Sequence, residues 1–257
     1  FWAAHVVHHQ SEDFNLGTAL RQSSSGFVAG WIFYVPMALL GFPPLVFAVV
    51  ALIDLLYQYW IHTEQIGRLG WFDRVFASPS NHRVHHGVNE RYLDKNYGGI
   101  LILWDRIFGT FEDERDDDPV VYGTRKPLQS HDPIWANLEV YAALARDSWR
   151  TRKLADKLRV WLKPPGWRPP DLAAQEPAAQ FDIEAVRKYD PPLSTAAAIY
   201  AGLLFVLLVA AGTHVLALDG ADLVRGDFKV PGALYAAWVV LSLWALGRWT
   251  EQRGGSQ

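Results

Sequence analysis

The chain has 257 residues, of which 50% are hydrophobic and 14% aromatic, and its formal net charge is −3. This composition excludes a disordered chain, and the absence of an overall basic charge argues against nucleic acid as a partner. Without any cysteine, the chain can form no disulfide, no cysteine-ligated metal site and no cysteine nucleophile. It begins at Phe1 and has one methionine, Met37, so we expect it to be the C-terminal portion of a longer protein.

The first predicted element is a short helix rich in histidine. His5, His8 and His9 are spaced i, i+3 and i+4, which places three imidazoles on one face of a helix. Imidazoles that converge in this way are suited to hold a metal ion. For any single histidine, the alternative is a hydrogen-bonded residue of the protein core.

An uncharged run between Gly26 and Asp54 predicts a hairpin of two apolar helices. The sequence Gly-Phe-Pro-Pro at residues 41–44 interrupts the run, because consecutive prolines cannot continue a helix. We therefore expect one helix at about residues 27–40 and a second at about residues 45–62. Whether each arm spans the membrane fully or only dips into it is left open, but in either case the two passes return the chain to the side on which it started.

A polar stripe follows the second arm of this hairpin. Asp54, Gln58, His62 and Gln65 fall close to one helical line, and polar groups on an apolar membrane helix are costly and usually functional. We therefore predict His62 as a metal ligand. Ligating imidazoles normally donate their second N–H to a neighbour, and we predict Gln58 and Glu64 as such neighbours.

A second triplet, His82, His85 and His86, repeats the first spacing after the hairpin. Because the hairpin returns the chain, the two triplets can meet at one membrane face. A site of imidazoles without cysteine or clustered carboxylates favours a first-row transition metal over magnesium or calcium. Two triplets predict two metal ions, which in paired sites lie about 3.5–4 Å apart.

The polar region that follows contains an acidic segment and a basic one. Residues 112–118 (EDERDDD) predict a solvated loop. Residues 135–163 have the spacing of one amphipathic helix, and from Arg146 to Lys163 there are seven basic and two acidic side chains. A basic helix rich in Trp and Leu is typical of a membrane interface, with a helix packed on protein as the alternative. Prolines end this helix, and residues 171–192 predict a linker.

Two apolar runs near the C-terminus predict membrane spans. Residues 196–218 form 23 uncharged positions, which as a helix reach roughly 34 Å and exceed a hydrocarbon core of about 30 Å. Residues 230–247 form a second, shorter run. The alternative for each run is the core helix of a soluble protein.

Together with the hairpin, these spans predict four crossings. Phe1, residues 62–192 and residues 248–257 would then share one side. Basic residues flank the span ends on that side, which predicts that it faces the cytoplasm: Arg187, Lys188, Arg248 and Arg253. The opposite loop, residues 219–229, has three acids and two bases.

Several segments resemble the fatty acid hydroxylase/sterol desaturase superfamily. Residues 5–15 with 19–22 are similar to its second histidine box, residues 60–64 and 81–87 to its later boxes, and residues 96–111 to the segment after them. Within the superfamily, the chain looks most like bacterial relatives of alkylglycerol monooxygenase. The superfamily's first histidine box is absent from this chain.

The resemblance implies a membrane di-iron oxygenase that uses O2 and an electron donor to hydroxylate a lipid C–H bond. It implies that the metals are carried by His5, His8, His9, His62, His82, His85 and His86. By the same analogy, Asn96 holds a bridging water, and Glu64 is the other candidate catalytic residue. The alkylglycerol monooxygenase likeness further implies an ether lipid as substrate and tetrahydrobiopterin as reductant. A desaturase with the same centre is the nearest alternative, and a histidine-rich membrane metal-binding or transport protein is the alternative of another class.

The expected fold is therefore all-α. It is an integral-membrane helical bundle with a di-metal site at its cytoplasmic end and an interfacial amphipathic helix, in a bacterial inner membrane. We expect a histidine-box domain at residues 1–121, the interfacial helix and linker at 122–192, and a helix pair at 193–257. Because the first box is missing, we expect this chain alone to be inactive.

Overall fold

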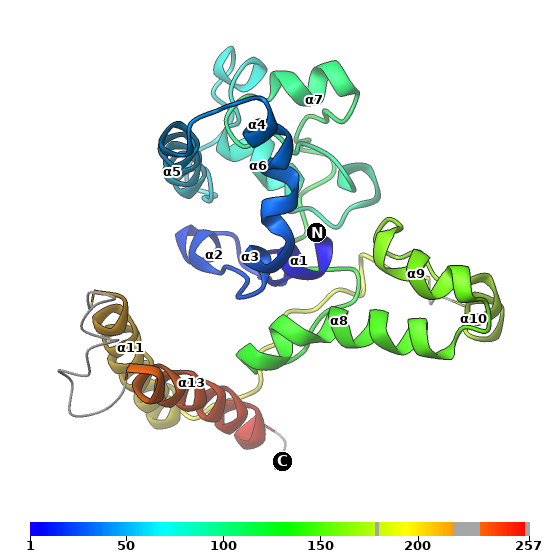
Figure 1. The fold of residues 1–257 in the computed structure, drawn as a ribbon. Coiled ribbons are helices and arrows are strands. Elements are labelled where there is room, and N and C mark those ends of the chain that lie inside the picture. Colours follow the sequence, from blue (N-terminus) through cyan, green and yellow to red (C-terminus); the bar gives the residue numbers. More distant parts are fainter. Residues whose placement is uncertain (178–179, 218–231, 255–257) are drawn as a thin grey trace. The chain divides into compact units, whose positions relative to one another are not determined.

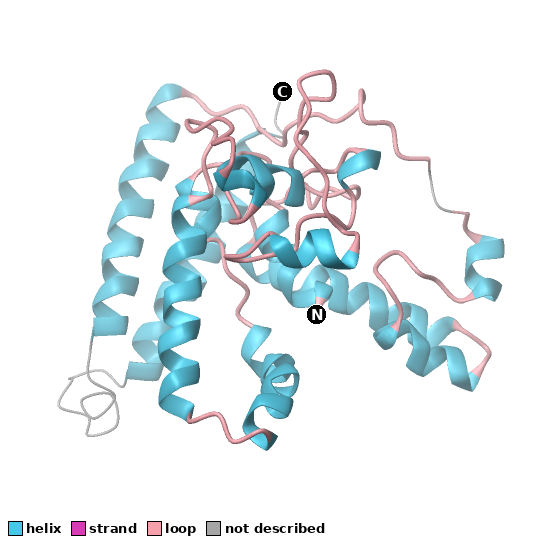
Figure 2. Cartoon of the chain, turned by 90° about the horizontal axis from the view of Figure 1, so that it is seen from above, coloured by secondary structure: helices cyan, strands magenta, loops and turns pink. Residues whose placement is uncertain are grey.

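The computed structural model describes residues 1–177, 180–217 and 232–254 (Figure 1). These residues form helices and connecting loops, and no strand is present among them (Figure 2). The predicted all-helical class is confirmed. The chain divides into two compact units, one of residues 1–128 with 139–187 and one of residues 129–138 with 188–257.

The first unit begins with two short helices, α1 (Trp2–His9) and α2 (Leu16–Leu20). The helix α1 carries the first histidine triplet, as its spacing predicts. The helix α2 begins at a capping box, in which the Asn15 side chain accepts a hydrogen bond from the N–H of Gly17 at 2.8 Å. Asn15 in turn donates its backbone N–H to the Thr18 hydroxyl at 3.2 Å. Such reciprocal bonds fix the start of a helix, here directly after α1.

The predicted hairpin is present, but its first arm is not one continuous helix. That arm consists of α3 (Gly26–Gly30), a 3-10 turn η1 (Trp31–Tyr34) and α4 (Val35–Leu39). Pro36 explains the break, because it has no N–H to offer the carbonyl of Ile32, which accepts from Val35 instead. The second arm, α5 (Pro44–Trp60), is an unbroken helix that begins at the predicted prolines.

The second histidine triplet lies on α6 (Pro79–His85) and at its C-cap, His86. Ser78 starts this helix with a capping box to Asn81, and its backbone N–H donates to the Asn81 side chain at 3.2 Å. Two 3-10 turns flank α6, η2 (Phe72–Arg74) and η3 (Glu90–Tyr92). The helix α7 (Leu103–Phe108) follows and ends at Gly109, whose φ of 75° suits glycine.

The single amphipathic helix predicted for residues 135–163 is wrong, because the structure has two helices there. These are α8 (Pro133–Arg150) and α9 (Leu154–Leu162). The break lies at Thr151, whose hydroxyl donates to Asp171 at 3.0 Å, while the backbone N–H of Arg152 donates to the other carboxylate oxygen at 3.0 Å. Asp171 belongs to α10 (Pro170–Gln175), a helix that overlaps the start of the predicted linker. A contact distant in sequence therefore ends α8.

The second unit contains the two C-terminal helices, α11 (Thr195–Ala217) and α13 (Gly232–Gly254), which pack side by side (Figure 1). Among the described residues, one helical segment is long and apolar enough to cross a membrane, Thr195–His214. The second predicted span forms a helix, but α13 continues beyond its apolar run to Gly254. The α5 helix is apolar but has only 17 residues. The predicted loop at residues 219–229 lies outside the described residues.

Candidate metal centre

Seven histidines of the first unit gather in two adjoining groups. Three elements supply them: α1, the residue two positions after α5, and α6 with its C-cap. In each group, one ring nitrogen per histidine lies within 4.8 Å of the others. The four-histidine cluster is buried and consists of His8, His62, His82 and His86, whereas the three-histidine cluster consists of His5, His9 and His85.

The two clusters do not follow the two sequence triplets. The α1 triplet gives His8 to the four-histidine cluster and its other two members to the three-histidine cluster. The second triplet gives His82 and His86 to the four-histidine cluster and His85 to the three-histidine cluster. The clusters adjoin through His9 and His86, whose stacked rings have centroids 4.3 Å apart. All seven predicted ligands therefore lie in one region, but each site draws on both helices.

Hydrogen bonds to backbone carbonyls fix the orientation of three of these rings. The Nδ1 of His8 lies 3.0 Å from the Thr18 carbonyl, and the Nδ1 of His62 lies 2.6 Å from the Gln58 carbonyl. His85 makes the same kind of bond to Lys95 at 3.2 Å. A carbonyl only accepts, so each Nδ1 carries the proton, and a neutral ring then presents an unprotonated Nε2.

Some of these unprotonated nitrogens lie so close together that a cation between them would stabilise them. The Nε2 atoms of His8 and His62 are 3.0 Å apart, and two lone pairs at that distance repel each other unless a positive ion lies between them. The Nε2 of His86 is buried and has no hydrogen-bond partner. Imidazole nitrogens arranged in this way fit a first-row metal such as iron.

The electrostatics of the clusters keep these histidines neutral. Burial, together with neighbouring histidines, lowers the pKa of His5 to about 3 and that of His8 to about 4. Burial also lowers the pKa of His62 to about 4. The pKa values of His9, His82 and His86 are well below the usual value for the same reasons. A neutral imidazole is the form that binds metal, so at neutral pH these histidines are already in the protonation state that a metal ion requires.

We expect the metal-free protein to lose stability as the pH falls from about 7 to 5. An unfolded histidine takes up a proton near pH 6.5, whereas His8 and His62 stay neutral in the fold until about pH 4. Between these values the unfolded chain binds more protons, so acid favours unfolding. Melting temperatures of the iron-free protein in detergent at pH 7 and pH 5 measure this, and equal temperatures would contradict it.

Of the two predicted neighbours of His62, Gln58 contacts the His62 ring directly and Glu64 does not. Gln58 contacts His62 through its backbone carbonyl, while its side chain donates to Asp54 at 2.7 Å. Glu64 is exposed and hydrogen-bonds to Tyr122. The Tyr122 ring stacks on Phe14, which in turn packs against the His62 ring at 5.4 Å. The rings of Tyr122 and Phe14 therefore lie between Glu64 and His62.

Asn96 is buried and its amide bonds to the backbone. Its two N–H groups donate to the carbonyls of Asn81 at 3.0 Å and Glu112 at 2.8 Å. Its carbonyl oxygen accepts from the N–H of Glu112 at 2.9 Å. The residue adopts a left-handed φ of 54°, which asparagine tolerates better than most residues. Asn96 thus links the start of α6 to the segment at Glu112.

The sequence interpretation missed a buried ion pair between Arg83 and Glu114. The Arg83 Nε and Nη2 atoms each donate to the Glu114 carboxylate at 2.7 Å. The remaining Nη1 donates to the carbonyls of Thr63 and Ile66 at 2.9 and 2.8 Å. The solvated loop predicted for residues 112–118 is therefore wrong at Glu114. The available signal was the position of Arg83 inside the second histidine triplet.

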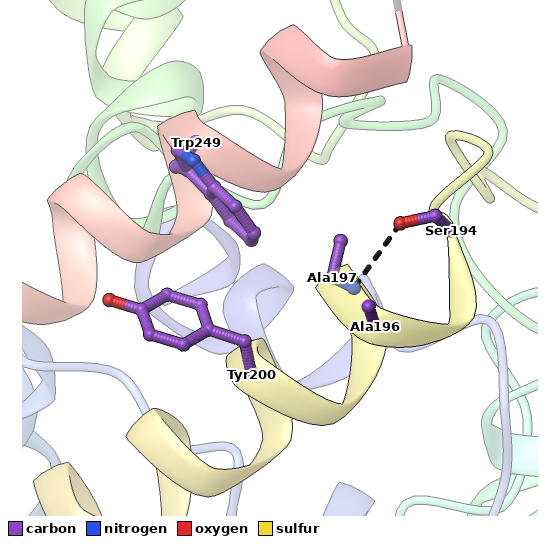
Figure 3. Close-up of a pocket in the computed structure, with 5 residues that line it drawn as sticks. All are labelled: Ser194, Ala196, Ala197, Tyr200 and Trp249. Atoms are coloured by element: carbon purple, nitrogen blue, oxygen red, sulfur yellow. Dashed lines mark hydrogen bonds between the residues drawn. The ribbon is translucent and has the colours of Figure 1, made fainter.

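The other two histidines and a surface pocket belong to the second unit. His131 lies 3.0 Å from the Thr250 hydroxyl, and His214 lies beside Tyr235 of α13. A pocket of about 410 Å³ lies between the ends of α11 and α13 and is lined by Ser194, Ala196, Ala197, Tyr200 and Trp249 (Figure 3). No histidine or carboxylate lines this pocket. Among the residues that the structure describes, the two histidine clusters lie in the first unit.

The chain is similar to several known proteins. Residues 1–110 match the fatty acid hydroxylase family. The chain is 43% identical over 258 residues to alkylglycerol monooxygenase of Danio rerio, which covers 99% of this chain and 56% of that protein. It is 40% identical over 258 residues to alkylglycerol monooxygenase of Homo sapiens, with 98% and 55% covered. Ornithine lipid hydroxylase OlsE of Rhizobium tropici is 39% identical over 77 residues, 30% of this chain and 23% of that protein. The chain thus spans about half the length of the alkylglycerol monooxygenases it matches, and no solved structure matches it.

Proposed function

Because the chain carries a fatty acid hydroxylase family domain at residues 1–110 and is homologous to alkylglycerol monooxygenases over nearly its whole length, we propose that it acts as a membrane lipid monooxygenase. Its iron centre would be held by the four-histidine cluster and the three-histidine cluster. Two adjoining clusters support a di-iron centre, since each offers at least three imidazoles. The observation that carries the proposal is the convergence of seven neutral histidines in one region.

In this proposal the protein supplies position and a dry environment. Bound iron would supply the activation of O2 that converts a lipid C–H bond into C–OH. The histidines orient the metals, and their Nδ1 bonds to backbone carbonyls hold His8, His62 and His85 in place. Phe14 packs on His62 and, at 5.1 Å, on His86, which excludes water from the four-histidine cluster. Glu64 and Asn96 would act as positioning groups around this centre.

The proposals for the substrate and the electron donor rest on the family resemblance of the sequence. We propose an ether lipid as substrate and tetrahydrobiopterin as reductant, in keeping with the alkylglycerol monooxygenase likeness. A desaturase would use the same histidines, because removal of a second hydrogen needs the same oxidant.

The experiment that tests the function compares oxygenation with metal transport. The longer protein that we expect to contain this chain is reconstituted in lipid vesicles with ferrous iron, an ether lipid and a reduced pterin, and O2 consumption and lipid product are measured together. We expect O2 consumption that depends on the lipid and yields a hydroxylated product. Release or uptake of metal across the vesicle without O2 consumption would favour the histidine-rich transport protein instead, and a lipid product with a new double bond would favour the desaturase.

We propose that the protein is an integral membrane protein with the histidine clusters on the cytoplasmic side. The segment Thr195–His214 and the apolar α5 support the membrane part. The bacterial inner membrane has no support from the two most extensively matched relatives named above, which are from vertebrates. The C-terminal helix pair, residues 193–257, would form its own membrane module.

We expect a reporter fused after Gln257 to lie in the cytoplasm. The four proposed crossings place that end on the same side as residues 62–192, and basic residues flank the spans there. A phosphatase or fluorescent reporter that is active on only one side of the membrane measures this, with a fusion inside residues 219–229 as the control for the opposite side. A C-terminal reporter on the non-cytoplasmic side would contradict this topology.

A further inference from the structure

The end of α8 and the whole of α9 form an exposed apolar surface that has no role in the proposed metal centre. Large apolar side chains are exposed there: Trp149 is 86% exposed, Leu154 79%, Leu158 70% and Leu162 83%. The three leucines follow one another at i, i+4 and i+8, so they share one face of α9. Trp161 lies beside them and is also exposed. We call these four residues of α9 the leucine stripe: Leu154, Leu158, Trp161 and Leu162.

The opposite side of α9 packs against the rest of the first unit, to which α9 belongs. Asp156 and Val160 are buried, and Lys157 donates from its ammonium group to the carbonyls of Ser148 and Trp149 at 2.8 and 2.9 Å. The orientation of α9 about its axis is therefore fixed by its own unit. Consequently the leucine stripe faces outward in the folded chain.

The charges around the leucine stripe are almost all positive. Both acidic side chains between Arg146 and Lys163 turn inward, because Asp147 pairs with Arg168 at 2.9 Å and Asp156 with Arg159 at 3.0 Å. The exposed charged side chains that remain in this segment are basic. Among the ion pairs of the described residues, none involves Arg146, Lys153 or Lys163, and these side chains are exposed. Lys153 and Lys163 stand at the two ends of α9.

We propose that the leucine stripe lies in the surface of a lipid bilayer with anionic headgroups. Apolar side chains on one face with lysines at both helix ends match such a surface, since the leucines enter the acyl region while the lysine ammonium groups stay at headgroup level. A protein partner would have to meet this basic rim with an acidic one, whereas anionic lipid supplies that charge at every position. The inference is independent of the chemistry at the histidines, so its failure would leave the oxygenase proposal intact.

The absence of cysteine from the chain permits a clean test with a single spin label. The Leu158→Cys variant is labelled and reconstituted in bilayers of phosphatidylcholine with phosphatidylglycerol, and its collisions with O2 and with a water-soluble nickel chelate are measured. O2 concentrates in the acyl region, and the chelate stays in water. We expect the label to collide with O2 and to be protected from the chelate. Because Leu158 is 70% exposed, its replacement removes little packing from the fold.

The matched control is Lys163→Cys, which lies about 140° around the same helix. Its label should collide readily with the chelate. A label at position 158 that the chelate reaches as easily as at position 163 would show a solvated stripe, and protection from both reagents would show that protein covers it. Either result would overturn the proposal.

A charge variant tests the anionic part separately. Lys153→Glu should increase exposure of the Leu158→Cys label to the chelate in bilayers with phosphatidylglycerol and leave it unchanged in phosphatidylcholine alone. An equal effect in both bilayers, or none in either, would show that headgroup charge plays no part.

Discussion

His86→Ala is expected to remove iron from the four-histidine cluster and to reduce turnover by more than about 100-fold, beyond the ~10–100-fold effects typical of groups that only support a metal ligand. The Nε2 of His86 is buried without a hydrogen-bond partner, and its ring stacks on His9 of the three-histidine cluster. Loss of this one imidazole therefore changes the ligand set of one cluster and the packing of the other. Elemental analysis for iron and lipid product formation, at equal protein levels in membranes, measure both effects in the longer protein that we expect to contain this chain.

His214→Ala is the matched control for this variant. His214 is also a histidine on a helix, but it lies in α11 beside Tyr235 and outside both clusters. We expect it to keep its iron and most of its activity. If His86→Ala retained iron and activity while His214→Ala lost both, the assignment of the metal centre to the first unit would be wrong.

Arg83→Gln is expected to lower iron affinity by about 10–100-fold, the range seen when a group that positions a metal ligand is lost. Arg83 joins α6 to the backbone at Thr63, which directly follows His62. This link sets the separation between His62 and the two α6 members of the four-histidine cluster. The substitution also leaves Glu114 without its partner, and the side chains of this pair are only 8% and 17% exposed. An uncompensated buried charge costs about 3–5 kcal/mol, so this variant should also be less stable.

A second variant separates the loss of position from the loss of stability. In Arg83→Gln with Glu114→Gln, no buried charge is left unpaired, so stability should recover in part, whereas iron affinity and the Mössbauer spectrum of the bound iron should stay altered. Arg83→Lys keeps the charge but cannot bind Glu114 through two parallel N–H groups, and it should be intermediate. Full recovery of iron affinity in the double variant would show that Arg83 acts on stability alone.

The control for this series is Arg68→Gln. Arg68 pairs with Asp116 at 2.9 Å, but the two side chains are 47% and 91% exposed, and exposed pairs contribute only about 0–1 kcal/mol. We expect no change in iron content. An effect as large as that of Arg83→Gln would attribute the loss to general charge rather than to the contact with Thr63.

Local sequence patterns predicted the elements that carry the site. The spacing of His5, His8 and His9 requires only helical periodicity, which is a property of neighbouring residues, and α1 has it. Pro43 and Pro44 placed the start of α5 correctly. Pro36 was equally visible, and it divides the first arm of the hairpin because a proline inside a helix removes a backbone donor wherever it occurs. The division of the first arm could therefore have been predicted from the sequence.

The sequence by itself determined that this protein is helical, that it carries two histidine triplets at helical spacing, and that one apolar run is long enough to span a membrane. The tertiary structure alone decided how the histidines are shared, because the distance between α1 and α6 depends on packing and not on spacing within either helix. It also decided that α8 ends at Thr151 and that Glu114 is paired rather than solvated. In each case the deciding partner lies 20 or more residues away along the chain, 20 for Thr151 with Asp171 and 31 for Arg83 with Glu114. A pattern of neighbouring residues carries no information about such a partner, since only the folded chain brings the two groups within hydrogen-bond distance.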